Sequence, residues 1–111
     1  MRQIITDEQA QAAFDWLVEN AGPAAAARAQ RERSEYRVKQ VKARLFLDAE
    51  GTVAEREHKA VAHDDYDKAI DALIEATEAD EFHRNQRSKA EAIISAWQTV
   101  QATQRAYARV G

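Results

Sequence analysis

Apolar residues in the first part of the chain recur every three or four positions, which is the spacing of one face of an α-helix. This first stripe consists of Ala10, Ala13, Phe14, Leu17 and Val18. Thr6 and Gln9 precede it with the spacing of a capping box, in which each side chain bonds the backbone amide of the other. Gly22 and Pro23 predict a break, because glycine suits the residue after a helix and proline suits the first turn of the next one. We therefore expect an N-terminal helix within residues 1–22.

The next segment, residues 23–50, has the pattern of a second helix with a narrower apolar stripe. That stripe consists of Val38, Val41 and Leu45. Gly51 predicts the end of this helix. Thr52 and Glu55 then repeat the spacing of a capping box, so a short helix is expected over residues 52–62.

The last segment, residues 64–109, contains neither glycine nor proline. Its two ends are amphipathic, whereas residues 77–89 between them contain Phe82 as their one large apolar side chain. The apolar positions of the two ends are Tyr66, Ala69, Ile70, Leu73 and Ile74, and Ala90, Ile93, Ile94, Trp97 and Val100. A polar stretch of this length is typical of a helix that is solvated in its middle, or of two helices that bend near Asn85. We favour one long C-terminal helix.

These segments predict an all-α protein with a single domain over residues 1–111. We expect the N-terminal helix, the second helix, the short helix and the long C-terminal helix to form an extended antiparallel hairpin or a small bundle. The chain is rich in alanine and has few large apolar side chains, so one copy can bury only a small core and association would bury more. We predict a homo-oligomer that assembles through aliphatic stripes. The predicted interface residues are Leu73, Ile74, Ile93, Ile94 and Trp97.

Several kinds of protein are excluded or disfavoured by composition. The chain has no cysteine, which excludes disulfides, thiol catalysis and cysteine-based zinc sites. No stretch approaches the roughly 20 apolar residues of a membrane span. The first six residues lack the apolar core of a signal peptide. We expect a cytoplasmic protein that has no contact with a membrane.

The net charge of −3 conceals a strong segregation of charge along the chain. Residues 28–44 hold seven basic residues against Glu32 and Glu35, so the second helix is a basic helix. Residues 64–81 hold eight acidic residues against one base, Lys68. The two blocks could pair with each other within or between subunits, or the basic block could bind a polyanion. Composition alone leaves both interpretations open.

Catalytic and metal-binding chemistry finds little support in the sequence. Glu55 and His58 have the spacing used in di-iron helical bundles, and Asp80 and His83 repeat it, but both pairs lie among charged residues. Nucleophile-elbow glycines and a glycine-rich phosphate loop are missing. The acidic residues at the predicted start of the last helix are explained by the helix dipole. We predict no enzyme activity, no catalytic residue, no metal site and no cofactor.

The stretch Tyr36–Leu47, together with Glu50–Arg56 and Lys59-Ala60, resembles a group of small helical phage and prophage proteins. In layout, over about residues 30–108, the chain also resembles the UvsY-type recombination mediators of T-even phages. The shared layout is a basic helix with a Lys-Ala-Arg-Leu core, a turn with glycine, a shorter helix and a long C-terminal helix. The turn is shorter here, and the helix around Phe14 and Trp16 has no clear counterpart.

The resemblance implies a protein that binds single-stranded DNA, assembles as rings and helps to load a recombinase onto strands covered by single-strand-binding protein. It implies DNA contacts by Lys39, Lys42 and Arg44, and by Arg56 and Lys59 on the following helix. Arg37 joins them on the basic helix, and Tyr36 and Phe46 at its borders offer aromatic faces for bases.

Our leading hypothesis is therefore a phage-type recombination accessory protein that binds single-stranded DNA as a homo-oligomer. A recombinase or a single-strand-binding protein is the further partner that this hypothesis suggests. The alternative is a protein-binding module, such as a phage inhibitor of a host defence complex or an assembly adaptor. In that case the acidic block would dock on a basic partner through residues such as Asp71, Glu75 and Glu78.

Overall fold

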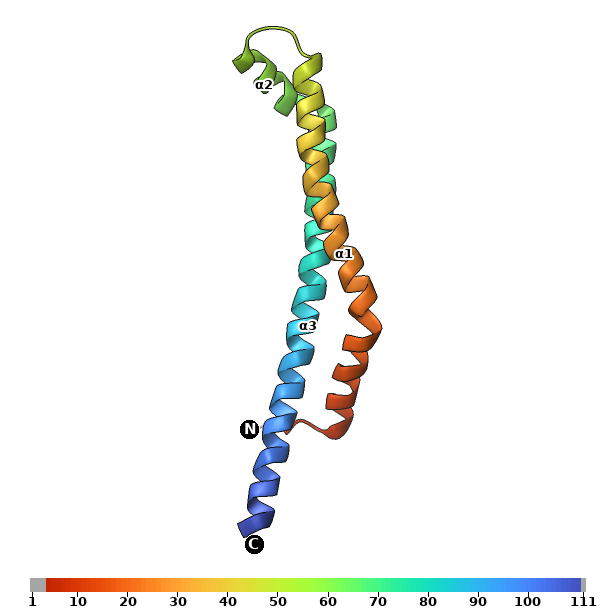
Figure 1. Cartoon of the computed structure of the whole chain (residues 1–111), viewed down its shortest axis with the longest axis vertical. Helices are drawn as coiled ribbons and strands as arrows, with labels where there is room; N and C mark the ends of the chain where they lie inside the picture. The colour runs from red at the N-terminus through yellow and green to blue at the C-terminus, as the bar shows by residue number, and fades with distance from the viewer. Residues whose placement is uncertain (1–3, 111) are drawn as a thin grey trace. The chain divides into compact units, whose positions relative to one another are not determined.

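The computed structural model describes residues 4–110, and over that range the chain is helical and contains no β-strand. Helices α1 (Asp7–Asp48), α2 (Val53–Ala62) and α3 (Asp64–Val110) follow one another along the chain (Figure 1). The predicted all-α fold is confirmed. The first three residues of the predicted segment 1–22, and the last residue of the chain, lie outside the described range.

Helix α1 continues through Gly22 and Pro23, so the predicted break into a helix within 1–22 and a separate basic helix over 23–50 is wrong. The fixed φ of proline fits an α-helix, and the penalty is one lost backbone hydrogen bond and a clash with the preceding turn. Residues 24–27 are all alanine, the residue type with the highest helix propensity. Ala24 is also buried, with 5 % of its surface exposed. Local propensity and packing therefore outweigh the proline.

The start of each of the first two helices follows the predicted capping box. The Thr6 backbone amide donates to Gln9 Oε1 at 2.9 Å, and the Gln9 amide donates to Thr6 Oγ1 at 3.1 Å. Thr52 caps α2 in the same sense, because its Oγ1 accepts from the Glu55 amide at 3.2 Å. Before it, Gly51 adopts a φ of +117°, a conformation open to glycine but strained for other residues.

The last helix, α3, is a single helix, as the sequence favoured, and it does not bend into two near Asn85. Its polar middle, however, does not simply face solvent. Asp80 is buried with 5 % of its surface exposed, whereas the nearby Phe82 is 59 % exposed. The inward side of α3 is therefore polar at this level, and the reason becomes clear from its partner on α1, described below.

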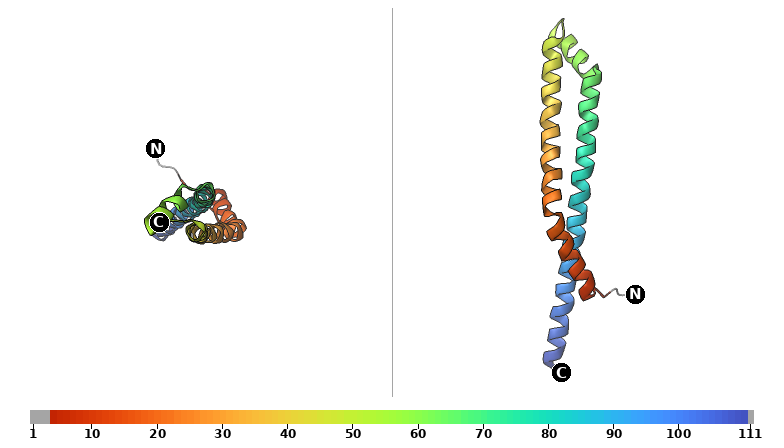
Figure 2. Two further views of the ribbon diagram at one scale, coloured as in Figure 1. Left: turned by 90° about the horizontal axis from the view of Figure 1, so that it is seen from above. Right: turned by 90° about the vertical axis from the view of Figure 1, so that its right-hand side faces the viewer.

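The contacts of the chain divide it into two compact units, each containing a segment of α1 and a segment of α3. We call residues 1–24 with 82–111 the terminal unit, and residues 25–81, which include α2, the central unit. Within each unit the two segments run antiparallel and side by side (Figures 1 and 2).

The buried residues of both units are mostly small. The terminal unit buries Ala10, Ala13, Ala24 and Ala90, and the central unit buries Ser34, Val41, Ala60, Ala69, Ala76 and Asp80. Ser34 and Val41 are one heptad apart, as are Ala69 and Ala76, which is the spacing of a coiled-coil seam. No large side chain in the described part of the chain is fully buried. Each unit thus contains a pair of helix segments with a thin seam, to which the central unit adds α2, and most of the large apolar side chains remain at least partly exposed.

Candidate nucleic-acid interface

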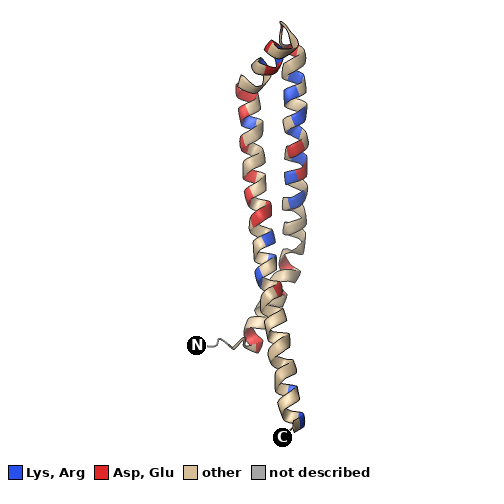
Figure 3. Cartoon of the chain, turned by 90° about the vertical axis from the view of Figure 1, so that its left-hand side faces the viewer, with Lys and Arg blue, Asp and Glu red and all other residues tan. Residues whose placement is uncertain are grey.

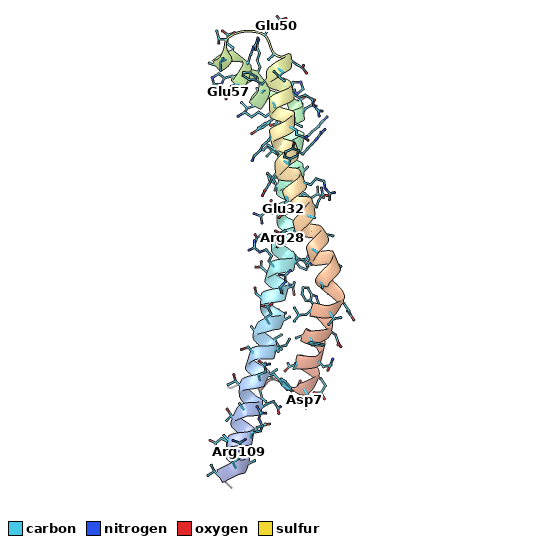
Figure 4. All side chains as sticks on the ribbon, viewed as in Figure 1. Asp7, Arg28, Glu32, Glu50, Glu57 and Arg109 are labelled. Atoms are coloured by element: carbon cyan, nitrogen blue, oxygen red, sulfur yellow. The ribbon has the colours of Figure 1, made fainter. Side chains whose placement is uncertain are left out.

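The basic block of α1 begins with two arginines whose charges are compensated within the chain. Arg31 bonds the Asp80 and Glu81 carboxylates of α3, each at 3.0 Å, and Glu35 at 3.5 Å. Arg28 pairs with Glu32, one turn along the same face of α1, at 3.4 Å (Figure 4). Hydrogen bonds to Asp80, and then to Glu81, raise the pKa of the Arg31 guanidinium above its ordinary value. These two arginines therefore have carboxylate partners.

The Arg31–Asp80 pair joins α1 to α3 at a seam position and explains the polar middle of α3. The Asp80 side chain is nearly inaccessible, with 7 % exposed, and the Arg31 side chain is 28 % exposed. A buried carboxylate is tolerated only when it is paired and hydrogen-bonded, so Asp80 favours the one register of α1 against α3 that places Arg31 beside it. The contact is structural, and it removes Arg31 from the set of cations that a ligand could use.

The remaining cations of the basic block have no carboxylate partner among the described residues. Within residues 4–110, none of them forms an ion pair: they are Arg33, Arg37, Lys39, Lys42 and Arg44. The acidic residues of the central unit lie mainly along α3 and the cations along α1 (Figure 3). One interpretation of the charge segregation was that the two blocks pair within one chain. Such pairing accounts for Arg31, but these five cations have no carboxylate partner in the described structure.

Two of these cations, Arg37 and Arg44, line a groove between α1 and α3 in the central unit. The groove has a volume of about 460 Å³ and an apolar floor that includes Val41 and Ala69. Lys68 of α3 lines the same groove and adds a third cation. We call this the arginine groove, and its full lining is Arg37, Val41, Arg44, Leu45, Asp48, Asp65, Lys68, Ala69 and Ala72.

Acidic residues also border the arginine groove. Asp48 is the last residue of α1 and Asp65 the second of α3, so both carboxylates lie at the end of the groove that is next to α2. Arg37 lies about three turns of helix before Asp48, toward the other end. The groove is therefore most favourable for an anion at the end formed by Arg37.

Lys68 is not among the binding residues that the sequence predicts. In the sequence, Lys68 is the one basic residue within the acidic block 64–81, so nothing in that block marks it as part of a cationic surface. Its position directly before the buried Ala69 is the signal that could have found it, because a residue beside a seam position flanks the facing helix. The position of Lys68 is informative only when Ala69 is already known to lie in the seam between α1 and α3.

The two lysines of the basic block face a different hollow. Lys39 and Lys42 line a space of about 400 Å³ whose surface is largely apolar. We call it the lysine hollow, and its lining is Lys39, Lys42, Ala43, Phe46, Leu47 and Glu57. The predicted nucleic-acid residues of α1 are thus separated onto two flanks, with the arginines on one and the lysines on the other.

Tyr36, which was predicted to stack on bases, is 63 % exposed. It lies one turn from Arg33 on one side and one turn from Lys39 on the other. Of the cations within a turn of it, only Arg33 has a bond in the structure, to Gln30 Oε1 at 3.3 Å. An exposed ring among uncompensated cations is what a base and its phosphates require.

The predicted binding residues of α2 are engaged within the chain. The Arg56 guanidinium lies over the Phe46 ring at 5.8 Å from the centroid, and its Nε is buried without a hydrogen-bond partner. The Lys59 ammonium donates to the Glu50 carbonyl oxygen at 2.7 Å, which ties α2 to the preceding turn. Both residues hold α2 in place, so the structure brings neither of them onto the flank that Arg37 and Arg44 form.

The residues predicted for oligomerisation divide by exposure. Ile74 is 51 % exposed on α3 of the central unit, and Leu73 beside it is half-buried. In the terminal unit Ile93, Ile94 and Trp97 are all half-buried, and the Trp97 indole N–H donates to Asp7 Oδ1 at 2.8 Å. Ile74 is thus the member of the set with the largest free apolar surface.

No cluster of three or more potential metal ligands occurs among the residues that the structure describes. None of the described helices is long and apolar enough to cross a membrane. Comparison of the chain with protein-family models, with curated proteins and with solved structures found no match.

Proposed function

We propose that this chain is a cytoplasmic binding protein, without enzyme activity, that binds single-stranded DNA as a homo-oligomer and acts as a phage-type recombination accessory protein. The observation that carries the DNA-binding part is the set of α1 cations beyond Arg31 that have no ion pair in the described structure. The recombination part is supported by the resemblance in layout to UvsY-type mediators.

The DNA-binding surface that we propose lies on the arginine side of α1. Arg33 and Arg37 are one turn apart, and Tyr36, one turn from Arg33 and beside these arginines, has an exposed ring. Arg44 and Lys68 extend the cationic surface along the arginine groove. Phosphates would bind the guanidinium and ammonium groups, and one base would stack on Tyr36. Contacts to phosphates and stacking on a ring do not read base edges, so such binding would be independent of sequence.

Fluorescence anisotropy of a labelled oligonucleotide over a salt series tests this surface. We expect binding that weakens steeply with salt, since each phosphate contact releases counterions. The variant Arg37→Glu with Arg44→Glu should lose at least about tenfold in affinity and flatten the log–log salt dependence by about 1.4, or about 0.7 per phosphate contact. Absence of binding by the unchanged protein at low salt would refute DNA binding.

The matched control changes the same number of charges in the terminal unit. Arg105 and Arg109 are exposed on α3 and form no ion pair within the described residues. Figure 4 labels Arg109 near the end of this helix. Arg105→Glu with Arg109→Glu lowers the net charge as much as the groove variant does, so it should leave most of the affinity intact. If both variants lose affinity equally, binding follows net charge and the assignment to the arginine side fails.

The recombination role needs its own test, because DNA binding alone does not distinguish it from other roles. A gene for a recombinase or for a single-strand-binding protein beside the gene of this chain would support it. Co-precipitation with such a neighbour, in the presence of nuclease, would show a direct contact. An unrelated neighbourhood together with no such contact would leave DNA binding and remove the recombination role.

A second candidate function is docking on a basic protein through the acidic side of α3. It is favoured by Asp71, Glu75 and Glu78, which are exposed and form no ion pair in the described structure. A phage inhibitor of a host complex or an assembly adaptor would have such a surface. Capture of a host protein that is lost on reversal of these three charges, with DNA binding absent, would favour this function over the first.

A further inference from the structure

The acidic side of α3 in the central unit has an exposed apolar residue at its centre. Ile74 is 51 % exposed, and Asp71 and Glu78 lie three residues before it and four residues after it, which places all three on one face. Both carboxylates are exposed, and neither forms an ion pair within residues 4–110. This face therefore consists of an aliphatic side chain between two carboxylates, and we call it the Ile74 knob.

The lysine hollow has the opposite character. Its interior is apolar, with Phe46 half-buried and Leu47 75 % exposed. Lys39 and Lys42, one turn apart, border it, and neither has an ion pair in the described structure. Its volume of about 400 Å³ is more than ten times the roughly 30 Å³ that one water molecule takes up in the liquid. The hollow therefore has room for an aliphatic side chain.

The knob and the hollow cannot satisfy one another within a single chain. The hollow is lined by residues of α1 and α2, and Ile74 of α3 is not among them. Each chain thus carries an apolar knob with an acidic border, and an apolar hollow that is bordered by two lysines and one carboxylate, that of Glu57. The two surfaces lie on different helices of the same unit. Surfaces that combine an apolar centre with a charged border are typical of protein contacts, and opposite charges fix partner and register.

We propose that the Ile74 knob of one copy docks in the lysine hollow of a second copy, with Asp71 and Glu78 facing Lys39 and Lys42. The inference rests on the homo-oligomer of the proposed function and does not depend on DNA binding. A second copy is the occupant because the chain itself supplies both complementary halves. The contact uses different surfaces on the two copies, so repeated contacts generate a ring where the rotation closes and a filament where it does not.

This arrangement divides the basic helix between two tasks. The lysines on one flank join the copies, and Arg33, Arg37 and Arg44 on the other flank remain available to DNA. Successive copies would then place their arginine grooves in a row, which suits a long strand better than a single short site does. Association would also cover Ile74 and Leu47, two of the large apolar side chains that the isolated chain leaves in water.

Light scattering coupled to gel filtration, without DNA and at tens of micromolar protein, tests the apolar half of the contact. The unchanged chain should elute as an oligomer, and Ile74→Glu should reduce it to the mass of a monomer. Val18 of the terminal unit is 63 % exposed on α1, so Val18→Glu is a matched control and should keep the oligomer. Circular dichroism confirms that both variants remain helical, which is expected because both positions are exposed.

Charge exchange tests the pairing itself. Lys39→Glu with Lys42→Glu should give a monomer, and so should Asp71→Lys with Glu78→Lys. All four changes in one chain leave the net charge as it was and should restore the oligomer, because the pairs are re-formed with reversed sign. The two double variants change the net charge in opposite directions. Repulsion that followed net charge alone would therefore not dissociate both of them.

The outcomes separate this contact from the proposed function. A monomeric unchanged protein would overturn both the contact and the homo-oligomer, whereas the DNA-binding result with Arg37 and Arg44 would stand by itself. An oligomer that persists in every variant would overturn this contact alone. Two monomeric charge variants whose combination stays monomeric would also overturn it, since direct pairing requires the rescue.

Discussion

The central and terminal units are built from the same two long helices, yet they hold those helices together by different means. In the central unit the seam includes an ion pair between Arg31 and Asp80, and uncompensated charges of opposite sign lie along α1 and α3. In the terminal unit the buried residues are alanines, and a polar contact between the helices is the bond from the Trp97 indole to Asp7.

The difference places the proposed binding surfaces in the central unit. From Ala92 to Gln104 the terminal part of α3 contains no charged residue, so little there could attract a polyanion. The central unit contains the arginine groove and the lysine hollow, each bordered by two or more cations, whereas a hollow of the terminal unit between α1 and α3 has Lys89 as the one cation in its lining. The terminal unit, in turn, contains both tryptophans, Trp16 and Trp97, so tryptophan fluorescence reports on it alone while circular dichroism reports on both.

The largest effect is expected at Pro23, near the boundary between the two units. Proline in a helix interior is about 3 kcal/mol less favourable than alanine, and the stiffness that it gives the unfolded chain offsets up to about 1 kcal/mol of this. Pro23→Ala should therefore raise the free energy of unfolding in urea by about 2 kcal/mol. The fluorescence and circular dichroism transitions should also move closer together, because the hydrogen-bond ladder of α1 becomes continuous.

Pro23→Ser serves as the companion variant, since serine restores the amide but has a lower helix propensity than alanine. It should give a smaller gain in the same direction. A loss of stability in both variants would mean that the proline has a structural role in α1 that alanine cannot fill.

A somewhat smaller loss is expected in the central unit from Asp80→Ala. The change removes the buried carboxylate that pairs with Arg31, while Glu81 and Glu35 remain within reach of the guanidinium. We expect the free energy of unfolding to fall by about 2 kcal/mol or slightly less, the range for a lost buried polar partner. Glu78→Ala, which removes an exposed carboxylate two residues away, should change it by no more than about 0.5 kcal/mol.

Hydrogen exchange locates the effect of Asp80→Ala. Amides of α1 and α3 in the central unit should lose protection, while those around Trp16 and Trp97 keep theirs. Equal loss in both units would show that the ion pair stabilises the whole chain and that the two units unfold together.

These residues also show how far the sequence can predict the structure. The helical class, the caps at Thr6 and Thr52 and the undivided α3 follow from local rules, because capping and propensity depend on residues within one turn. The continuity of α1 through Pro23 does not follow, since it depends on helix packing around Ala24. The inward position of Asp80 was missed because most buried residues of the seam are alanine, serine or aspartate, which a search for large apolar residues passes over.

The candidate site was predictable in part for the same reason. The charge block of α1 is visible in the sequence, but its division into an arginine side and a lysine side depends on where α2 and α3 pack. Lys68 joins the arginine groove because α3 packs beside α1, and the Arg56 guanidinium lies over the Phe46 ring rather than on the arginine side. Such facts belong to tertiary contacts between residues far apart in sequence.

Replacing a helix cap in each unit compares the two units through losses of stability of about 1 kcal/mol. Thr6→Ala removes a reciprocal capping box from the terminal unit, and Thr52→Ala removes the cap of α2 from the central unit. Each should lower stability by about 1 kcal/mol, the typical cost of an N-cap replaced by alanine. Tryptophan fluorescence should register the first change and be nearly insensitive to the second. If the fluorescence transition shifts equally in both, α2 contributes to the stability of the terminal unit.

The smallest effect is expected from Trp97→Phe in the terminal unit. Phenylalanine keeps most of the apolar contact of the ring but cannot donate to Asp7 Oδ1, a bond of 2.8 Å between exposed groups. Because water can replace the lost partner, the free energy of unfolding should fall by only about 0.5 kcal/mol. Trp16 remains as the fluorescent reporter, so the same urea titration measures the change.

A loss of about 2 kcal/mol or more, similar to that for Asp80→Ala, would mean that this bond ties α1 to α3 as firmly as the Arg31 pair does. The contrast between a register fixed by charge and a seam held by alanines would then not hold.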